Sequence, residues 1–272
     1  TYFYKRLLTV NVTGIHHEAI YLQKQTTMLQ QLPLENILCL DIETVPQYPD
    51  FDSTPEELRK LWLRKASNLK KSEDETEEGI YSRAGIYAEF GKIICISTGF
   101  LVIKDGQRSF RLKSFYGDDE KELLTEFGAL LQQIHDTRQK GGKQSMVLCG
   151  HNAKEFDFPY ISRRMIIHGI ALPPQLDLFG KKPWEVPHID TMELWKFGDY
   201  KSFTPLNLLA YILGIPSPKD DIDGSQVGNV YWQEKNLERI VTYCQKDVVT
   251  VMQILLRLKN ESLLQTEEVI IP

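Results

Sequence analysis

The feature that most constrains the fold is a short apolar run, ILCLDIE, at residues 37–43. It is rich in residues that favour strands and has the length of a buried central strand. Asp41 and Glu43 lie two positions apart in this run, so their side chains point to the same face. Two carboxylates on a buried strand repel each other unless a positive group joins them, which favours a metal ion. Taken singly, however, an Asp-x-Glu pair is more often structural or on the surface.

The pattern of elements along the chain predicts a mixed α/β domain. Asp105-Gly106 marks a turn between two strands that continue the first one as an antiparallel meander. Residues 189–194 fit a short strand that runs into a helical turn. The other predicted elements are strands over residues 92–102, 109–116 and 146–149, and helices over residues 118–136, 159–168, 206–213 and 236–258.

The elements also suggest how the chain divides. We interpret residues 1–34 as an N-terminal extension, residues 35–260 as one domain, and residues 261–272 as a C-terminal tail. The domain contains an insertion at residues 44–91, in which two predicted helices, over residues 55–70 and 79–89, flank a highly charged loop. The insertion leaves the carboxylate end of the first strand, so we expect it to form one wall of a substrate channel.

Composition restricts the class of protein. The formal net charge of −5 argues against a protein that coats a duplex through its phosphates, but an enzyme that holds only a strand end needs less positive charge. No apolar run reaches the length of a membrane span, and the first thirty residues lack the order of a secretory signal. The four cysteines form no Cys-x-x-Cys pair and fit buried, reduced thiols rather than structural zinc. We therefore expect a cytoplasmic protein with no membrane association.

A second acidic cluster, GHNAKEFDFPY, occupies residues 150–160 between a predicted strand and a predicted helix. Pro159 suits the first position of that helix, which places Asp157 beside the helix N-terminus. The helix dipole keeps a carboxylate ionised there, as a metal ligand must be. Helix capping is the alternative explanation for Asp157.

A third cluster, YCQKD, lies at residues 243–247 on the last predicted helix. A spacing of four places Tyr243 and Asp247 on one helix face, one turn apart. The apolar residues around them indicate that this face is largely buried, and a lone Asp there is costly. Packing of Tyr243 and solvation of Asp247 are the alternative explanations.

Together and in this order, the three clusters resemble the DEDD exonucleases of the RNase H-like superfamily, in the subgroup that contains a tyrosine. The chain is similar, from about residue 37 to residue 258, to the proofreading exonuclease domain of family B DNA polymerases and to stand-alone bacterial predicted exonucleases. Thr242 stands where the histidine subgroup would have His. The segments that carry the resemblance are LDIET, HNAKEFDFPYISRR and YCQKDVV at residues 40–44, 151–164 and 243–249.

The resemblance implies an RNase H-like mixed five-stranded sheet flanked by helices. It also implies a metal-dependent 3′-5′ exonuclease that hydrolyses phosphodiester bonds at the 3′ end of single-stranded nucleic acid, with DNA favoured, and releases nucleoside 5′-monophosphates. Tyr243 would position the attacking water. The residues that would hold two Mg²⁺ or Mn²⁺ ions, in an all-oxygen site without nearby Cys or His ligands, are Asp41, Glu43, Asp157 and Asp247.

Substrate contacts follow from the same resemblance. Thr44, Asn152 and Phe156 would contact the terminal nucleotide, although a core role for Phe156 fits equally well. Several basic side chains are candidate phosphate contacts, with ordinary surface charge as the alternative for each. They are Arg163, Arg164, Lys181, Lys182, Lys196 and Lys201.

Two other functions stay open from the sequence. The enzyme could trim RNA, because no residue pattern reads a 2′-hydroxyl. Alternatively, the domain could be a catalytically inactive nucleic-acid-binding module, although no acidic position of the subgroup is missing. A role in proofreading or repair would require a separate polymerase or repair protein as a partner.

Overall fold

The computed structural model describes residues 28–70, 72, 74–199, 201–216 and 222–271. The chain divides into two compact units, residues 1–34 and residues 35–272. Most of the predicted N-terminal extension, residues 1–27, lies outside the described residues. In the first unit the structure describes the short helix α2 (Met28–Gln31).

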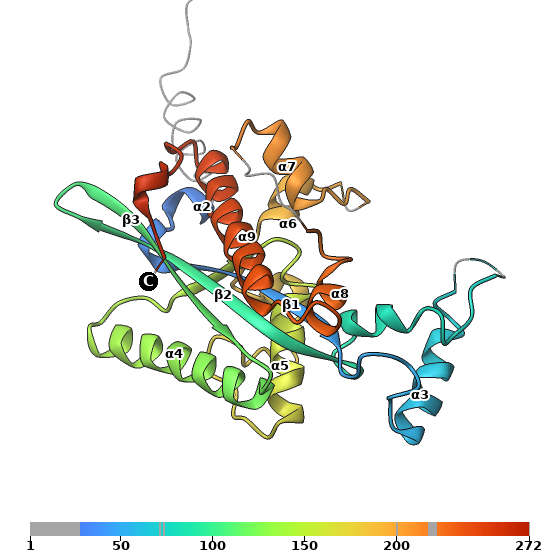
Figure 1. The fold of residues 1–272 in the computed structure, drawn as a ribbon. Coiled ribbons are helices and arrows are strands. Elements are labelled where there is room, and N and C mark those ends of the chain that lie inside the picture. Colours follow the sequence, from blue (N-terminus) through green and yellow to red (C-terminus); the bar gives the residue numbers. More distant parts are fainter. Residues whose placement is uncertain (1–27, 71, 73, 200, 217–221, 272) are drawn as a thin grey trace, which may run out of the picture. The chain divides into compact units, whose positions relative to one another are not determined.

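A six-stranded mixed sheet, in the order β5-β4-β1-β2-β3-β6, organises residues 35–272 (Figure 1). β1 lies inside the sheet, antiparallel to β2 and parallel to β4. The mixed sheet with flanking helices is therefore confirmed. The strands are β1 (Ile37–Pro46), β2 (Gly91–Lys104), β3 (Gln107–Tyr116), β4 (Val147–Gly150), β5 (Ile189–Asp190) and β6 (Val269–Ile270).

The sheet has one strand more than the five predicted. β6 pairs in parallel with β3 and lies in the segment that we interpreted as a C-terminal tail. Two residues are too few to show an alternating pattern, so β6 could not be predicted from the sequence. One further prediction needs correction, because residues 81–86 of the insertion form a 3-10 helix rather than an α-helix. The structure also contains a helix that was not predicted, α8.

The helices follow the predicted order. None of the described helices combines the length and apolar character that crossing a membrane requires. The α-helices of the second unit are α3 (Glu56–Ala66), α4 (Glu120–Lys140), α5 (Asp157–Ile167), α6 (Thr191–Lys196), α7 (Leu206–Ile212), α8 (Val227–Trp232) and α9 (Leu237–Leu258). The 3-10 helices are η1 (Leu34–Asn36), η2 (Tyr81–Ile86), η3 (Pro183–Glu185) and η4 (Thr266–Glu268).

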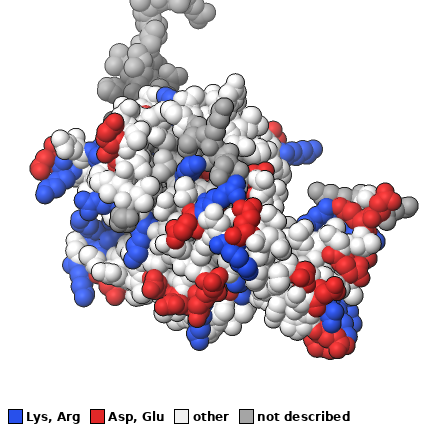
Figure 2. Space-filling view, in the orientation of Figure 1, with Lys and Arg blue, Asp and Glu red and all other residues white. Residues whose placement is uncertain are grey.

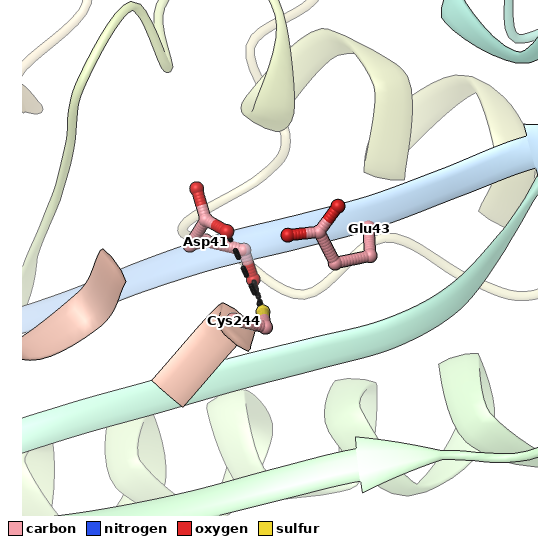
Figure 3. A group of neighbouring side chains, drawn as sticks. All are labelled: Asp41, Glu43 and Cys244. Carbon is pink, nitrogen blue, oxygen red and sulfur yellow. Dashed lines mark hydrogen bonds between the residues drawn. The ribbon is translucent and has the colours of Figure 1, made fainter. Parts of the chain in front are cut away.

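The alternation of side chains along β1 separates the core from the acidic residues. Leu38, Leu40 and Ile42 point to one face, where they pack with buried residues of α4 and α5 in the main hydrophobic core. Asp41 and Glu43 point to the other face, where the Cys244 thiol of α9 contacts Asp41 (Figure 3). One strand therefore supplies both the core and the acidic group, because its residues alternate between the two faces.

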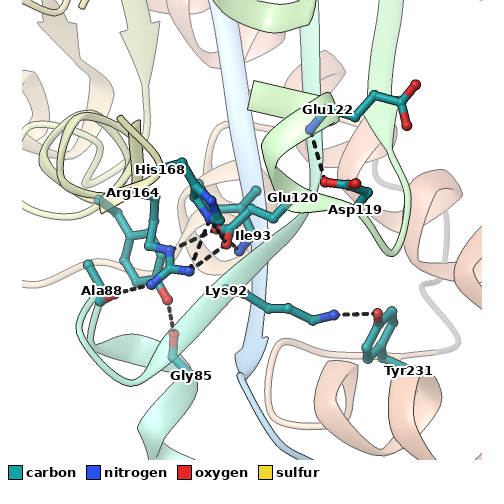
Figure 4. A network of polar contacts seen from close by, with 11 residues as sticks. Gly85, Ala88, Lys92, Ile93, Asp119, Glu120, Glu122, Arg164, His168 and Tyr231 are labelled. Atoms are coloured by element: carbon teal, nitrogen blue, oxygen red, sulfur yellow. Dashed lines mark hydrogen bonds and ion pairs between the residues drawn. The ribbon is translucent and has the colours of Figure 1, made fainter. Parts of the chain in front are cut away.

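A buried ion pair joins α4 to α5 (Figure 4). The Arg164 guanidinium donates to both carboxylate oxygens of Glu120, at 2.9 and 2.5 Å, and to the main-chain oxygen of Ala88 at 2.8 Å. Glu120 also accepts from the main-chain N–H of Ile93 at 2.7 Å. Arg164 is only 2% exposed, so its prediction as a phosphate contact is wrong. Its positive charge is paired with Glu120 inside the fold and cannot contact a phosphate at the surface.

The insertion has a small core of its own, in which Trp62 packs edge-on against Tyr81 and Phe90. It is also tied to the main core, because the Tyr160 hydroxyl of α5 donates a 2.7 Å hydrogen bond to the Gly85 carbonyl. The insertion thus rests beside the end of β1 that carries the acidic pair. Its proposed role as a channel wall stays a prediction.

Candidate functional site

Asp41 and Glu43 project from β1 to the same side, as their spacing predicts (Figure 3). Their carboxylate oxygens and the Cys244 sulfur all lie within 4.8 Å of one another. Glu43 is buried and Asp41 is half-buried. The pairing of β1 with β2 shifts register between Glu43 and Thr44, so the strand is irregular immediately after the acidic pair.

Asp157 is the first residue of α5, beside the helix N-terminus as predicted, and is 4% exposed. Its Oδ1 accepts a hydrogen bond of 3.2 Å from the main-chain N–H of Ile42, which lies between the two acidic residues of β1. Burial raises the pKa of Asp157 to about 7, and the charges of Asp190 and Asp247 act in the same direction. Hydrogen bonds from main-chain N–H groups partly oppose this rise.

The electrostatics of Asp41 show that four carboxylates converge. Burial raises the pKa of Asp41 well above its ordinary value, and the charges of Asp157, Glu43 and Asp247 raise it further. Burial also raises the pKa of Glu43, and the charge of Asp247 raises it further. Each carboxylate of the predicted set therefore lies near enough to the others to disfavour their ionisation together.

Tyr243 lies one turn before Asp247 on α9, half-buried and hydrogen-bonded to it. Burial, and then the charges of Asp247, Glu43 and Asp41, raise the pKa of Tyr243 far above its ordinary value. The phenol therefore stays protonated at neutral pH. It can donate a hydrogen bond but cannot act as a general base.

Cys244 corrects the expectation of a site without a nearby cysteine. Its Sγ donates hydrogen bonds of 3.4 Å to both the main-chain oxygen and Oδ2 of Asp41. Burial raises the pKa of this thiol well above its ordinary value, so it stays protonated. Because thiolates rather than thiols bind metals, Cys244 acts here as a hydrogen-bond donor to Asp41. The four cysteines are all buried and free, as predicted.

The donor set fits hard divalent cations. Of the described residues, the groups that shift the pKa values of Asp41 and Glu43 are acids and thiols, and none is a Lys or Arg. Carboxylate oxygens are the ligands that Mg²⁺ and Mn²⁺ prefer. Bound cations would remove the repulsion that raises these pKa values.

Asp190 is a residue of the site that the sequence analysis missed. It ends β5, is 3% exposed, and accepts four main-chain N–H hydrogen bonds. Its Oδ1 accepts from Asn152, Met192 and Glu193 at 2.9, 3.0 and 3.2 Å, and its Oδ2 accepts from Lys154 at 3.0 Å. Asp190 therefore caps α6 and also fastens the loop that leads to Asp157. Of these two roles, only the capping of α6 could be predicted from the sequence, because an Asp directly before a helix is a common N-cap.

The predicted substrate contacts lie around this loop. Asn152 has a left-handed backbone (φ 62°), which Asn tolerates better than most residues, and its buried Oδ1 has no hydrogen-bond partner among the described residues. Phe156 is half-buried and packs on Tyr160 with ring centres 5.3 Å apart. Thr44 follows the register shift in β1, and its side chain hydrogen-bonds Tyr160. Phe156 thus belongs partly to the core, the alternative considered for it.

His151, which precedes Asn152, also holds the loop in place. One ring nitrogen lies 2.9 Å from the Thr191 hydroxyl and the other lies 2.8 Å from the Thr204 carbonyl oxygen. Gly150 makes the tight approach possible, because a Cβ there would lie 2.4 Å from the Cβ of Ala153. The turn after β4 is therefore held by its own close packing and by hydrogen bonds to Asp190, Thr191 and Thr204.

Comparisons with known proteins place the chain in a family. A family model described as "predicted 3′-5′ exonuclease related to the exonuclease domain of PolB" matches residues 86–268, about two thirds of the chain. The match includes Asp157, Tyr243 and Asp247 and begins after Asp41 and Glu43.

No curated protein sequence gives a significant match. A solved structure similar to this one is the family B DNA polymerase from the hyperthermophilic archaeon Pyrobaculum calidifontis, with 17% identity and a TM-score of 0.46. The alignment covers 81% of this chain and 24% of the polymerase, so the chain spans about a quarter of that protein. By the match over residues 86–268, the chain belongs to the family of predicted 3′-5′ exonucleases related to the exonuclease domain of PolB.

Proposed function

We propose that this protein is a divalent-metal-dependent exonuclease that removes nucleotides one at a time from the 3′ end of single-stranded DNA and releases nucleoside 5′-monophosphates. The observation that carries the proposal is the convergence of Asp41, Glu43, Asp157 and Asp247, which raises the pKa of Asp41. A fold gains nothing from holding four carboxylates together unless cations join them. The family description supplies the polarity of the reaction.

The four carboxylates would hold two Mg²⁺ or Mn²⁺ ions. When bound, such ions supply positive charge at the reacting phosphate and make water a competent nucleophile near neutral pH. The protein contributes the fixed positions of its ligands. Asp41 is held by the Cys244 thiol, and Asp157 by the N–H of Ile42. Rigid ligands of this kind place charge where it develops in the transition state.

Tyr243 orients the attacking water in this proposal. Its raised pKa keeps the hydroxyl protonated and donating to Asp247, so the phenol oxygen can accept a hydrogen bond from the water but cannot take up the water's proton. Thr44, Asn152 and Phe156 surround the terminal nucleotide. The unpartnered Oδ1 of Asn152 supports this role, because a substrate N–H or O–H group would satisfy it.

The test is turnover of 5′-labelled single strands. Purified protein with Mg²⁺ or Mn²⁺ should shorten a DNA strand stepwise from its 3′ end, and EDTA should stop the reaction. Asp41→Ala and Asp247→Ala should abolish shortening, while Tyr243→Phe should slow it on the order of 100-fold. Glu126→Ala, at an exposed position on α4, is the matched control and should retain full activity.

The same assay distinguishes the alternatives. Faster shortening of RNA than of DNA would replace the DNA assignment with RNA trimming. If neither strand shortens with either metal but both bind, the inactive binding module becomes the correct description. Normal rates in Asp41→Ala protein would refute the assignment of the site itself.

A further inference from the structure

Cys244 brings a sulfur atom into the acidic site, beside the two carboxylates of β1 (Figure 3). One oxygen each of Asp41 and Glu43 lies within 4.8 Å of that sulfur and of the other oxygen, so the three side chains are close enough to share one cation. Oxygen ligands suit Mg²⁺ and Mn²⁺, whereas a sulfur ligand selects softer cations. The site therefore offers two classes of cation two different sets of ligands.

The separation of Cys244 Sγ and Asp41 Oδ2 fits two neighbouring ligands of one tetrahedral cation. In protein zinc sites the Zn–S distance is about 2.3 Å and the Zn–O distance is about 2.1 Å. Two such ligands of a tetrahedron lie roughly 3.6 Å apart. The two atoms are 3.4 Å apart in this structure. The hydrogen bond between thiol and carboxylate thus already sets the spacing that a tetrahedral cation requires.

Glu43 is a second, independent indication of a ligand. Acidic side chains are common on the surface of this protein (Figure 2), where water solvates them. Glu43 differs from these because it is only 7% exposed, and no hydrogen-bond donor and no Lys or Arg of the described residues acts on its pKa. A buried carboxylate without such a partner is unfavourable. The Glu43 carboxylate points toward Asp41 (Figure 3), so a cation held there would satisfy it.

We propose that the acidic site also binds Zn²⁺, with Asp41, Glu43 and the Cys244 thiolate as its three protein ligands, and that the zinc-bound protein is inactive. On binding, the S–H bond of Cys244 breaks, the sulfur binds the cation, and the proton passes to solvent. A thiophilic cation displaces this proton, whereas Mg²⁺ prefers oxygen and leaves the thiol donating to Asp41. The inference rests on the proposed function, because inhibition requires that the same carboxylates hold the catalytic ions.

Inhibition follows from the ligands that the two forms share. In the proposed reaction Asp41 and Glu43 are two of the four carboxylates that hold Mg²⁺ or Mn²⁺. A cation that is drawn to the Cys244 sulfur removes both of them from that set. Asp41 also loses the hydrogen bond that the thiol donates to it. Because Zn²⁺ binds such ligands more tightly than Mn²⁺ does, excess Mn²⁺ should relieve the inhibition only weakly.

The alternative is that Zn²⁺ binds through the carboxylates alone, as Mg²⁺ would. The two arrangements differ in whether the sulfur contacts the cation, and a contact between a thiolate and a metal gives an ultraviolet charge-transfer band. Cd²⁺ is the probe for this contact, because it is as thiophilic as Zn²⁺ and its thiolate band is readily measured. The experiment therefore detects the sulfur ligand directly and needs no nucleic acid.

Titration of the full chain with Cd²⁺, after removal of EDTA, should produce the thiolate band. Cys244→Ser keeps a hydroxyl donor beside Asp41 but has no sulfur, so it should lose this band. Its Cd²⁺ affinity should fall by more than the roughly 10–100-fold that loss of a supporting contact costs. Glu43→Gln, which leaves the sulfur in place, should also weaken Cd²⁺ binding. Cys149→Ser, the same change at a buried cysteine of β4, is the matched control and should keep the band.

Turnover with Mg²⁺ supplies the second readout. Zn²⁺ should inhibit the wild type at concentrations at least about 10-fold lower than it inhibits Cys244→Ser, with each protein compared with its own uninhibited rate. Equal inhibition of the two proteins would overturn the inference, as would an unchanged Cd²⁺ band in Cys244→Ser.

The two readouts also separate this inference from the proposed function. If no metal supports turnover while the Cd²⁺ band depends on Cys244 and Glu43, the proposed function fails and the zinc site stands. If Mg²⁺ supports turnover and Cd²⁺ gives no thiolate band, the proposed function stands and the zinc site is refuted.

Discussion

The main-chain N–H of Ile42 donates a hydrogen bond of 3.2 Å to Oδ1 of Asp157, joining residues 115 positions apart in the chain. Ile42 lies between Asp41 and Glu43, so this bond sets the start of α5 against the acidic pair of β1. A strand and a helix that are remote in sequence are thereby held in the arrangement that brings their carboxylates together. The site is thus fixed by main-chain geometry as well as by side-chain packing.

Asp190→Asn tests the anchoring of the loop that leads to Asp157. An asparagine Nδ2 in place of Oδ2 would face the Lys154 N–H, so one hydrogen bond is lost and two donors oppose each other. We expect a loss of about 2–3 kcal/mol in the free energy of unfolding, and a lower kcat from displacement of Asp157. Urea unfolding and the exonuclease assay measure the two effects. Glu193→Gln, which alters only the ion pair between the half-exposed Glu193 side chain of α6 and Lys154, should change neither by much.

Arg163 and Arg164 are neighbours with opposite expected behaviour. Arg164→Ala leaves Glu120 buried without its guanidinium partner and should cost about 3–5 kcal/mol in the free energy of unfolding. Arg163→Ala, at an exposed position, should change that free energy by no more than about 0.5 kcal/mol. Equal stabilities for the two variants in urea would show that the buried ion pair contributes nothing to the fold.

Asp41→Asn should stabilise the metal-free protein while it abolishes activity. Burial and three neighbouring carboxylates raise the pKa of Asp41, so its ionised form destabilises the fold at neutral pH. Removing that charge should increase the free energy of unfolding in EDTA by about 1–2 kcal/mol. Mg²⁺ should then stabilise the wild type more than the variant, because the variant binds it less well. A variant less stable than the wild type in EDTA would contradict this account, and Glu126→Gln controls for the change in net charge.

His188 makes stability depend on pH below neutrality. Its Nδ1 accepts from the N–H of Leu148 at 3.3 Å, and its Nε2 donates to the Gln175 carbonyl at 2.6 Å. Burial lowers the pKa of His188 to about 4, so the unfolded chain binds this proton more readily than the folded one. The contribution is complete above pH 6.5 and is lost as the pH falls toward 4.

His188→Gln isolates this contribution, since glutamine does not titrate. Between pH 7 and pH 5 the wild type should lose about 2 kcal/mol more than the variant in the free energy of unfolding. Urea unfolding of both proteins at the two pH values measures the difference. Parallel pH dependences would mean that His188 is protonated equally in the folded and unfolded states.

The sequence was sufficient for the central strand and for the three acidic clusters, because each depends on local pattern. The alternation in residues 37–43 predicts that Asp41 and Glu43 share a face, and β1 places them so. Spacing by four predicts that Tyr243 and Asp247 share a helix face, and they are hydrogen-bonded on α9. The spacing of residues predicts which side chains share a face when the strand or helix is long enough to show its period.

The contacts that depend on tertiary structure could not be predicted. Cys244 appeared as a buried thiol, but its hydrogen bonds to Asp41 arise only when α9 lies on β1. Arg164 appeared as one of six basic candidates, and only the packing of α4 on α5 shows that Glu120 pairs with it. Nothing in the residues around Asp190 reveals that two of its four donors come from the turn after β4.

The contact between Cys244 and Asp41 joins residues 203 positions apart. Closing so long a loop costs chain entropy, which the packing of α9 on β1 must offset. Because α9 also carries Asp247, a fragment that ends before α9 lacks one of the four carboxylates. If the four carboxylates bind divalent cations as proposed, such a fragment should bind them more weakly than the whole chain, which cation titration of both would measure.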